Sequence, residues 1–523
     1  MMNFQGKNLQ GANSANTAHA RQTATNTAYS ETLDSSAHTN HTAHAKLAKH
    51  ASHTAPTKRA THANAIATPA KRALSACALI AATFAPLSAF DIKYNGWLES
   101  FSKVGFVDNG IDENLGKYPT DSFTTMIGSF GIDGNILSQE NAKHKMTYGL
   151  SVTAGGLVLD STDSRFPLGR DSVNNEYVGN WSGYKGDLPY GEQRRLYVIN
   201  NAYIDYKLGD FSNDAFSFQF KGGRYESGAE YMSGFTQGFE FAARFRFSDS
   251  QALKLWWFSS YGRAFASGQW MVDFYSPRGY FTDGGRFANY GIHAFKATYS
   301  IGGLDVIPFI YFSPGTYTAP ALQLRYDTNR GFEQEGWRSQ TILHFINPIH
   351  DDRIVGQYFY GDRAGKSTQT LYIYERVDYA QYNFGLGLYK NFGNANARIG
   401  TTGNPVALDF WTASAYELGR SISDIIGNDA ITPFLFVGGL HYSKKFEWQI
   451  LARYTESTRS QEHSVAGSVG YRFDGGLRIG AKLEYYNDIT KAGYRTGANG
   501  NTAGTPQNIA DRSHAFAWIR YDF

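Results

Sequence analysis

From residue 90 onward the chain alternates between apolar and polar positions, and this period of two predicts β-strands. In FEFAARFRF (239–247) the phenylalanines share one face, while Arg244 and Arg246 lie on the other. The final segment, HAFAWIRYDF (514–523), repeats the pattern. A single alternating segment is ordinarily an edge strand of a soluble sheet. Its recurrence in segments of about 9 to 11 residues is typical of tilted strands that cross a membrane.

Two kinds of connection alternate between these segments. Tight turns occur at 248–251, 300–303, 443–445 and 474–476, and long polar segments at 160–194, 264–288, 402–430 and 488–511. Short turns at one end and long loops at the other are the layout of a transmembrane antiparallel β-barrel, with the short turns in the periplasm. The fold class is therefore all-β. The length after residue 89 predicts about 18 strands, within a range of roughly 16 to 20 that depends on the segments 350–380 and 392–402.

The first 89 residues differ in composition from the rest. Residues 1–70 are rich in Ala, Thr, Asn and His, which predicts a disordered low-complexity extension. Residues 71–89 begin with two basic residues, continue with an Ala-rich apolar stretch and end on small residues, the layout of a secretory signal. We expect the barrel to occupy residues 90–523. The only cysteine, Cys77, lies in the signal, so cleavage would remove disulfides and thiol chemistry from the protein.

The charge balance changes once residues 1–89, called here the leader, are left out. The chain has 49 basic and 46 acidic residues; the leader holds eight and two of these, which leaves 41 basic and 44 acidic residues in the barrel. This near-neutral balance gives no indication of nucleic-acid binding. After the signal there is no apolar run long enough for a membrane helix, and no repeat of about 40 to 50 residues that a β-propeller would show.

Three stretches resemble a known family: GWLESFSKVGF (96–106), FEWQILARYTESTRS (446–460) and KLEYYNDITKAGY (482–494), together with the terminal strand. They are similar to the Helicobacter outer membrane proteins, a family of porin-like barrels, and more distantly to the OprD-type substrate-specific porins of 18 strands. The resemblance covers most of residues 90–523. It implies location in the outer membrane of a Gram-negative bacterium and channel activity, but it does not specify the solute.

The end of the chain carries a second resemblance. A terminal phenylalanine with apolar residues at every second position before it resembles the signature read by the outer-membrane barrel-assembly machinery. In this sequence the signature consists of Ile519, Tyr521 and Phe523.

Alternate side chains of a strand point to opposite faces, and we call the face on which a residue lies its parity. Charged strand residues are assigned to the lumen, because a charged side chain that faces lipid near the midplane of the bilayer costs about 2–4 kcal/mol. The pore-lining residues predicted in this way are Lys221, Glu240, Arg244, Arg246, Arg325, Arg338, Glu447, Arg453, Arg472, Arg478, Lys482, Glu484 and Arg520. An excess of guanidinium groups could guide carboxylates by bidentate hydrogen bonds. Alternatively, these cations pair with acidic residues and leave a mixed small-solute pore, which the near-balance of charge favours.

No sequence motif indicates a catalytic, metal or cofactor site, so we expect neither enzymatic activity nor a cofactor. The first functional hypothesis is a channel for passive or substrate-guided diffusion of small hydrophilic solutes. The second is a surface adhesin anchored by the barrel, with loops 160–194, 264–288 and 402–430 as the binding face. Loop 402–430 is apolar enough either to fold inward, which would favour the channel, or to dock on a host surface as an exposed loop, which would favour the adhesin. Expected partners are outer-membrane lipid and lipopolysaccharide, the assembly machinery and small solutes, with a homotrimer left open.

Overall fold

The computed structural model of the protein describes twelve stretches of the chain. They are residues 91–107, 120, 122–138, 143–160, 196–269, 271–276, 280–281, 287–356, 358–359, 362–394, 424–494 and 504–523. The predicted extension (1–70), the predicted signal with Cys77 (71–89), and most of the predicted loops 160–194 and 402–430 lie outside the described residues. Within the described part, no helix is long and apolar enough to cross a membrane.

The described chain is built from long antiparallel strands, each paired with its neighbours in sequence. Eighteen of them form one sheet. They are β1 (Asp91–Gly105), β2 (Phe123–Ser138), β3 (His144–Asp160), β4 (Tyr197–Leu208), β5 (Phe216–Ala229), β6 (Met232–Arg246), β7 (Gln251–Ala266), β11 (Ile292–Ile301), β12 (Leu304–Ser313), β13 (Tyr317–Asp327), β14 (Trp337–Ile346), β18 (Gln369–Tyr379), β19 (Tyr382–Phe392), β20 (Ile431–His441), β21 (Phe446–Glu456), β22 (Ser460–Arg472), β23 (Leu477–Thr490) and β25 (His514–Asp522).

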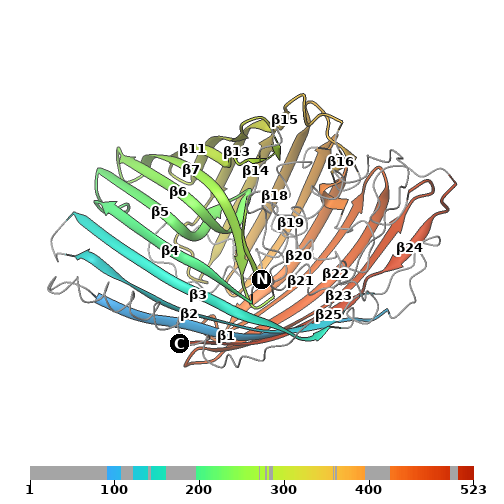
Figure 1. Ribbon diagram of the computed structural model, residues 1–523, viewed down its shortest axis with the longest axis horizontal. Helices are drawn as coiled ribbons and strands as arrows, with labels where there is room; N and C mark the ends of the chain where they lie inside the picture. Colours follow the sequence, from blue (N-terminus) through green and yellow to red (C-terminus); the bar gives the residue numbers. More distant parts are fainter. Residues whose placement is uncertain are drawn as a thin grey trace, which may run out of the picture.

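The sheet closes on itself through its first and last strands. β1 pairs antiparallel with β25, from Trp97 opposite Asp522 to Gly105 opposite His514. In Figure 1 the blue β1 and the red β25 lie side by side at the bottom of the barrel. Closure pairs the backbone groups that an open sheet edge would leave exposed to lipid. The eighteen-stranded barrel confirms the fold and the strand number predicted from the sequence.

The connections divide into two ends of the barrel, because successive strands run in opposite directions. The predicted tight turns at 248–251, 300–303, 443–445 and 474–476 all fall at one end, called here the short-turn end. The predicted long loops fall at the other, the long-loop end, which also holds the short elements β8 (Met271–Tyr275), β9 (Tyr280–Phe281), β10 (Phe287–Ala288), β15 (Ile349–His350), β16 (Tyr358–Phe359), β17 (Asp362–Arg363), β24 (Asn508–Asp511) and the 3-10 helix η4 (Asp424–Ile426).

Some strands are longer than a membrane crossing requires. β12, β13 and β14 have 10 or 11 residues, as expected. β2 and β3 have 16 and 17 residues. A tilted crossing takes about 9 to 11 residues. In the register, Trp97 of β1 lies opposite Asp522 at the end of β25 and Asp91 lies opposite Asn135 of β2, so β2 and β3 continue past the end of β25 at the short-turn end. Sequence alternation marks only the part of a strand whose two faces meet different solvents.

The barrel reverses the polarity of a soluble protein. On β25, Ile519 and Tyr521 are 51% and 46% exposed, whereas the side chain of the intervening Arg520 is only 12% exposed. On β20, Leu435 is 60% exposed and its neighbour Phe434 is 6% exposed. Apolar residues thus cover the outer face, while charged residues and a set of aromatic residues fill the interior. This arrangement is stable only where the outer face meets lipid.

Candidate functional site in the barrel lumen

A segment of loop 264–288 folds into the lumen at the long-loop end. Its strand β8 pairs with the end of β7 and packs against inward-facing residues of β1 and β2. Phe274 and Val272 join Phe101 and Ile127 in one apolar cluster, and Phe101 and Ile127 are fully buried. The hydroxyl of Thr125 donates a hydrogen bond to the carbonyl of Gly268. The segment is therefore held against the inner wall by apolar packing and by a hydrogen bond.

The turn between β5 and β6 also bends inward. Tyr231 is 1% exposed and its hydroxyl lies 2.8 Å from Nε2 of His344 on β14. The carboxylate of Glu230 lies 3.6 Å from the ammonium of Lys296 on β11. The turn therefore lies against strands that follow β7 in the sheet.

A third inward contact comes from η4, at the end of the predicted loop 402–430. Ile425 is fully buried against inward-facing aromatic residues of β18, β19 and β20. The backbone N–H of Asp424 donates to Oε1 of Glu462 (2.5 Å), and its carboxylate binds Arg459 and Ser457. The described end of this loop thus folds inward, which is one of the two arrangements that the sequence left open; residues 402–423 lie outside the described residues. Three segments narrow the long-loop half of the lumen.

Most of the predicted lumen arginines are ion-paired in the wall. Arg325 binds Asp305 on the neighbouring β12 (2.7 Å). Arg338 binds Asp327 on β13 through two nitrogens. Arg453 binds Glu462 on β22 (2.7 Å), and both side chains are 1% exposed. Each pair joins adjacent strands, so the charges of the wall are neutralised locally.

The strands around the closing seam show the same pairing. Arg520 binds Glu99 across the β25–β1 seam (3.2 Å), and Arg478 binds Asp522 (3.0 Å). Lys482 lies 2.5 Å from Glu484, whose other oxygen accepts a hydrogen bond from Ser464 (2.6 Å). The seam is thereby closed by ion pairs on the inside as well as by backbone hydrogen bonds.

The wall formed by β5, β6 and β7 differs from the rest. Lys221 lies over the rings of Tyr203 and Tyr225, with its ammonium 4.4 and 4.7 Å from their centroids. Arg244 is paired in register with Lys254. Among the described residues, neither Lys221 nor Arg244 lies within ion-pair distance of a carboxylate. Glu240, opposite Lys221 in the register, accepts a hydrogen bond from the indole N–H of Trp256 (3.2 Å).

The remaining predicted residues lie at the short-turn end. Arg246 donates to the carbonyl of Asn213 (2.9 Å) and pairs with Asp249, so it fastens two turns together at the rim. Arg472 is the last residue of β22 and is exposed. Glu447, near the start of β21, lines a cavity described below. Of the predicted assembly signature, Ile519 and Tyr521 lie on the outer face, and Phe523 pairs with Gly96 through two backbone hydrogen bonds of 3.0 Å.

Sequence reasoning missed the acidic half of these pairs. Asp305, Asp327 and Glu462 bind the arginines, yet the predicted list contained none of them. The alternation of side chains would have assigned these acidic residues to the lumen. Asp305, for example, lies on the same face of its strand as Ile307 and Phe309, which are 4% exposed. Within the described residues, no group of three His, Cys, Asp or Glu side chains could hold a metal ion.

A small cavity lies at the short-turn end, beneath the connection between β13 and β14. This connection, residues 328–336, is called here the strap. It is fixed at both sides: Arg330 binds Asp305 on β12 (2.8 Å), and the amide of Gln334 donates to the carbonyl of Leu440 on β20 (2.6 Å). Because β18 and β19 lie between β14 and β20, the strap crosses the inner side of two strands.

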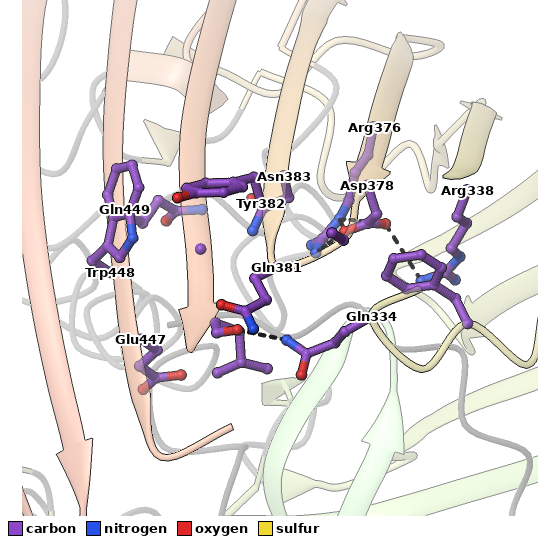
Figure 2. Close-up of a pocket in the computed structure, with 14 residues that line it drawn as sticks. Gln334, Arg338, Arg376, Asp378, Gln381, Tyr382, Asn383, Glu447, Trp448 and Gln449 are labelled. Carbon is purple, nitrogen blue, oxygen red and sulfur yellow. Dashed lines mark hydrogen bonds and ion pairs between the residues drawn. The ribbon is translucent and has the colours of Figure 1, made fainter. Parts of the chain in front are cut away.

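The cavity has a volume of about 60 Å³. Its lining, shown in Figure 2, is Phe332, Gln334, Arg338, Arg376, Asp378, Ala380, Gln381, Tyr382, Asn383, Gly439, Leu440, Glu447, Trp448 and Gln449. The two arginines converge on one carboxylate: Arg376 binds Asp378 at 2.6 Å and Arg338 approaches it at 3.7 Å. The lining is thus polar, with most of its charge paired.

Comparison with known proteins identifies the family of the chain. A family model described as "Putative outer membrane protein" matches residues 76–523. The chain belongs to this family. It is a Helicobacter-type family, as the sequence resemblance indicated, and it places the protein in the outer membrane of a Gram-negative bacterium. No curated protein matches the chain significantly in sequence.

Solved structures of two bacteria are similar in fold to this family member. OccAB1 of Acinetobacter baumannii has a TM-score of 0.53 at 9% identity, covering 83% of this chain and 96% of its own. OccAB4 of the same organism has a TM-score of 0.50 at 10% identity, covering 84% and 99%. OccK3 (OpdO) of Pseudomonas aeruginosa has a TM-score of 0.50 at 9% identity, covering 83% and 96%. At such identities the likeness establishes the common barrel fold.

Proposed function

We propose that this outer-membrane protein is a channel through which small hydrophilic solutes diffuse. The observation that carries the proposal is the closed barrel of eighteen strands with a charged interior and an apolar exterior. Barrels of 16 to 18 strands are wide enough to leave an aqueous lumen. The segments that fold inward at β8 and η4 narrow the passage and are anchored to the wall, as expected of a channel that restricts the size of its solutes.

The charge pattern supports a weakly selective pore. Arg325, Arg338, Arg453, Arg478 and Arg520 are each neutralised by a carboxylate of the wall. In the wall of β5, β6 and β7, Lys221 and Arg244 have no carboxylate within ion-pair distance among the described residues. A pore whose arginines are largely paired attracts anions less than a ladder of free guanidinium groups would. We expect a modest preference for anions and no catalytic activity.

Assembly and orientation complete the proposal. The terminal Phe523, whose backbone closes the β25–β1 seam, serves as the recognition signal for the assembly machinery. The short-turn end faces the periplasm and the long-loop end faces lipopolysaccharide at the cell surface. A homotrimer is compatible with the apolar outer face, although that face is equally suited to lipid.

Single-channel recording of the purified protein in a planar bilayer tests the function. Stepwise conductance in symmetric KCl is expected, and a KCl gradient should give a small reversal potential with the sign of anion preference. A barrel that is folded by circular dichroism yet never conducts would refute the channel. Ion selectivity that is strong and unchanged when Arg244 is replaced by Gln would refute the assigned role of the β5–β7 wall.

A further inference from the structure

One carboxylate in the middle of a strand faces outward. Ile373, two residues before Glu375 on β18, is 38% exposed, whereas the intervening Tyr374 is 7% exposed and packs in an apolar cluster of the lumen. Glu375 therefore shares the outer face with apolar residues. In the described long strands from β11 to β21, each of 10 or 11 residues, the other outward-facing charged residues are Lys390 and Glu456, within two residues of a strand end. Glu375 is thus an exception to the rule that charges face the lumen.

The depth of Glu375 places it in the hydrocarbon of the membrane. Trp337 and Tyr379, at the short-turn ends of β14 and β18, are 65% and 48% exposed, with ring centroids 4.8 Å apart. Exposed aromatic residues at the strand ends form the girdle that marks the membrane interface. Glu375 is four residues from Tyr379, or about 13 Å along the strand at roughly 3.3 Å per residue. With strands tilted by about 40° in an apolar band about 25 Å tall, the carboxylate lies about 10 Å deep, near the midplane.

Two hydroxyl groups hold this carboxylate in place. Ser339 and Thr341 on the neighbouring β14 donate hydrogen bonds of 2.6 and 2.5 Å to the two oxygens of Glu375. Each carboxyl oxygen keeps a further lone pair, which hydrocarbon cannot satisfy. Leu343 on β14 and Leu386 on β19, 40% and 61% exposed, flank the group on the outer face. The outer face therefore presents an oriented polar group surrounded by apolar side chains.

A second copy of this chain is the partner that fits such a group. Lipid tails carry no hydrogen-bond donor, whereas a second barrel in the same membrane carries its own Glu375 at the same depth. Two carboxyl groups that are brought together can share a proton and hydrogen-bond to each other. A two-fold contact uses the same patch on both copies, so it brings a residue near the axis against its counterpart. Polar side chains join membrane-embedded segments in this way.

We propose that the outer face of β14, β18 and β19, which are neighbours in the sheet (Figure 1), is the contact between two copies of the protein related by a two-fold axis along the membrane normal. The Glu375 carboxyl groups of the two copies bind each other at the axis, and Leu343 and Leu386 pack around them. In a three-fold assembly this face would meet a different face, and Glu375 would not meet its counterpart. The contact goes beyond the proposed function and does not depend on whether the barrel conducts.

Energy transfer between barrels in lipid vesicles measures this association. Donor and acceptor dyes are attached at Ala215→Cys, an exposed rim position, in a protein that also carries Cys77→Ser to remove its only native cysteine. The unaltered face should associate, and Glu375→Leu should weaken the association at least about tenfold. The Glu375→Leu barrel should remain folded by circular dichroism, because leucine suits a lipid-facing position.

Two further variants separate hydrogen bonding from the mere loss of a carboxylate. Glu375→Gln should associate within about threefold of the unaltered protein, since two carboxamide groups also donate to and accept from each other. Glu456→Leu is the matched control. It removes an outward-facing carboxylate at the end of β21, where Glu456 pairs with Lys491, and should leave the association unchanged.

Spin labels determine which faces meet. Gln381 lies in the turn between β18 and β19, and Ala215 lies just before β5, nearly half of the ring away; both are exposed at the short-turn end. The distance between the nitroxides of two copies, measured by electron–electron double resonance, should be shorter for Gln381→Cys than for Ala215→Cys. Each assembly should contain two interacting spins.

The outcomes decide the interface independently of the channel. Absence of association at high protein-to-lipid ratio, or association that Glu375→Leu leaves unchanged, would overturn it. Three interacting spins per assembly, or a shorter distance for Ala215→Cys than for Gln381→Cys, would overturn it as well. Selective loss in Glu375→Leu together with the shorter distance for Gln381→Cys would sustain the interface even for a barrel that never conducts, in which case only the channel fails.

Discussion

Replacement of Glu462 by Ala is the sharpest test of how the lumen is held together. Glu462 accepts hydrogen bonds from Arg453 (2.7 Å) and from the backbone N–H of Asp424 (2.5 Å). With both side chains of the ion pair 1% exposed, Glu462→Ala leaves Arg453 buried and without this carboxylate. Removing one partner of a buried pair costs about 3–5 kcal/mol. The orphaned N–H of Asp424 adds about 1–3 kcal/mol.

These two contributions are not fully additive, because water in the lumen can reach part of the exposed polar surface. We therefore expect a loss of about 4 kcal/mol in the free energy of unfolding. The double variant Arg453→Met with Glu462→Met removes both charges together and should lose only about 1–3 kcal/mol, the cost of the unpaired N–H. The difference in the free energy of unfolding between the two variants measures the cost of leaving the charge of Arg453 without its partner.

Equilibrium urea unfolding in lipid vesicles, followed by tryptophan fluorescence, measures these values from midpoints at constant slope. Glu456→Ala provides the control, since its side chain is 35% exposed and its pair with Lys491 is near the rim, so a loss of about 1 kcal/mol or less is expected. Equal destabilisation by Glu462→Ala and by the double variant would refute the reasoning, since it would mean that Arg453 is hydrated once its partner is removed.

Three further predictions concern the outer face, the lumen and assembly. Leu435→Arg on the outer face of β20 should destabilise the barrel by about 2–4 kcal/mol in urea unfolding, whereas Tyr442→Arg in an exposed turn should cost about 0–1 kcal/mol; equal effects would contradict the lipid-facing assignment. Phe274→Ala should loosen β8 from the inner wall and raise single-channel conductance, and unchanged conductance would place the constriction elsewhere. Deletion of Phe523 should lower the yield of folded protein in the outer membrane, measured by heat-modifiable electrophoretic mobility, with less effect on refolding in detergent.

The sequence determined the barrel because parity is a local property. Successive side chains of a strand point to opposite faces, so one alternating segment fixes which residues face lipid and which face the lumen. Ile519 and Arg520 could be assigned to opposite faces from ten residues of sequence. The alternation and the turns limited the strand number to a narrow range, and the length after residue 89 predicted about 18, since in an up-and-down barrel each turn joins neighbouring strands.

Only the tertiary structure decided what the inward residues contact. Arg520 and Glu99 are far apart in the sequence, in the last and the first strand of the barrel. They meet only because the sheet closes at the β25–β1 seam. The inward fold of β8 and the reach of the strap to Leu440 depend on packing across the lumen, for which a strand pattern carries no information.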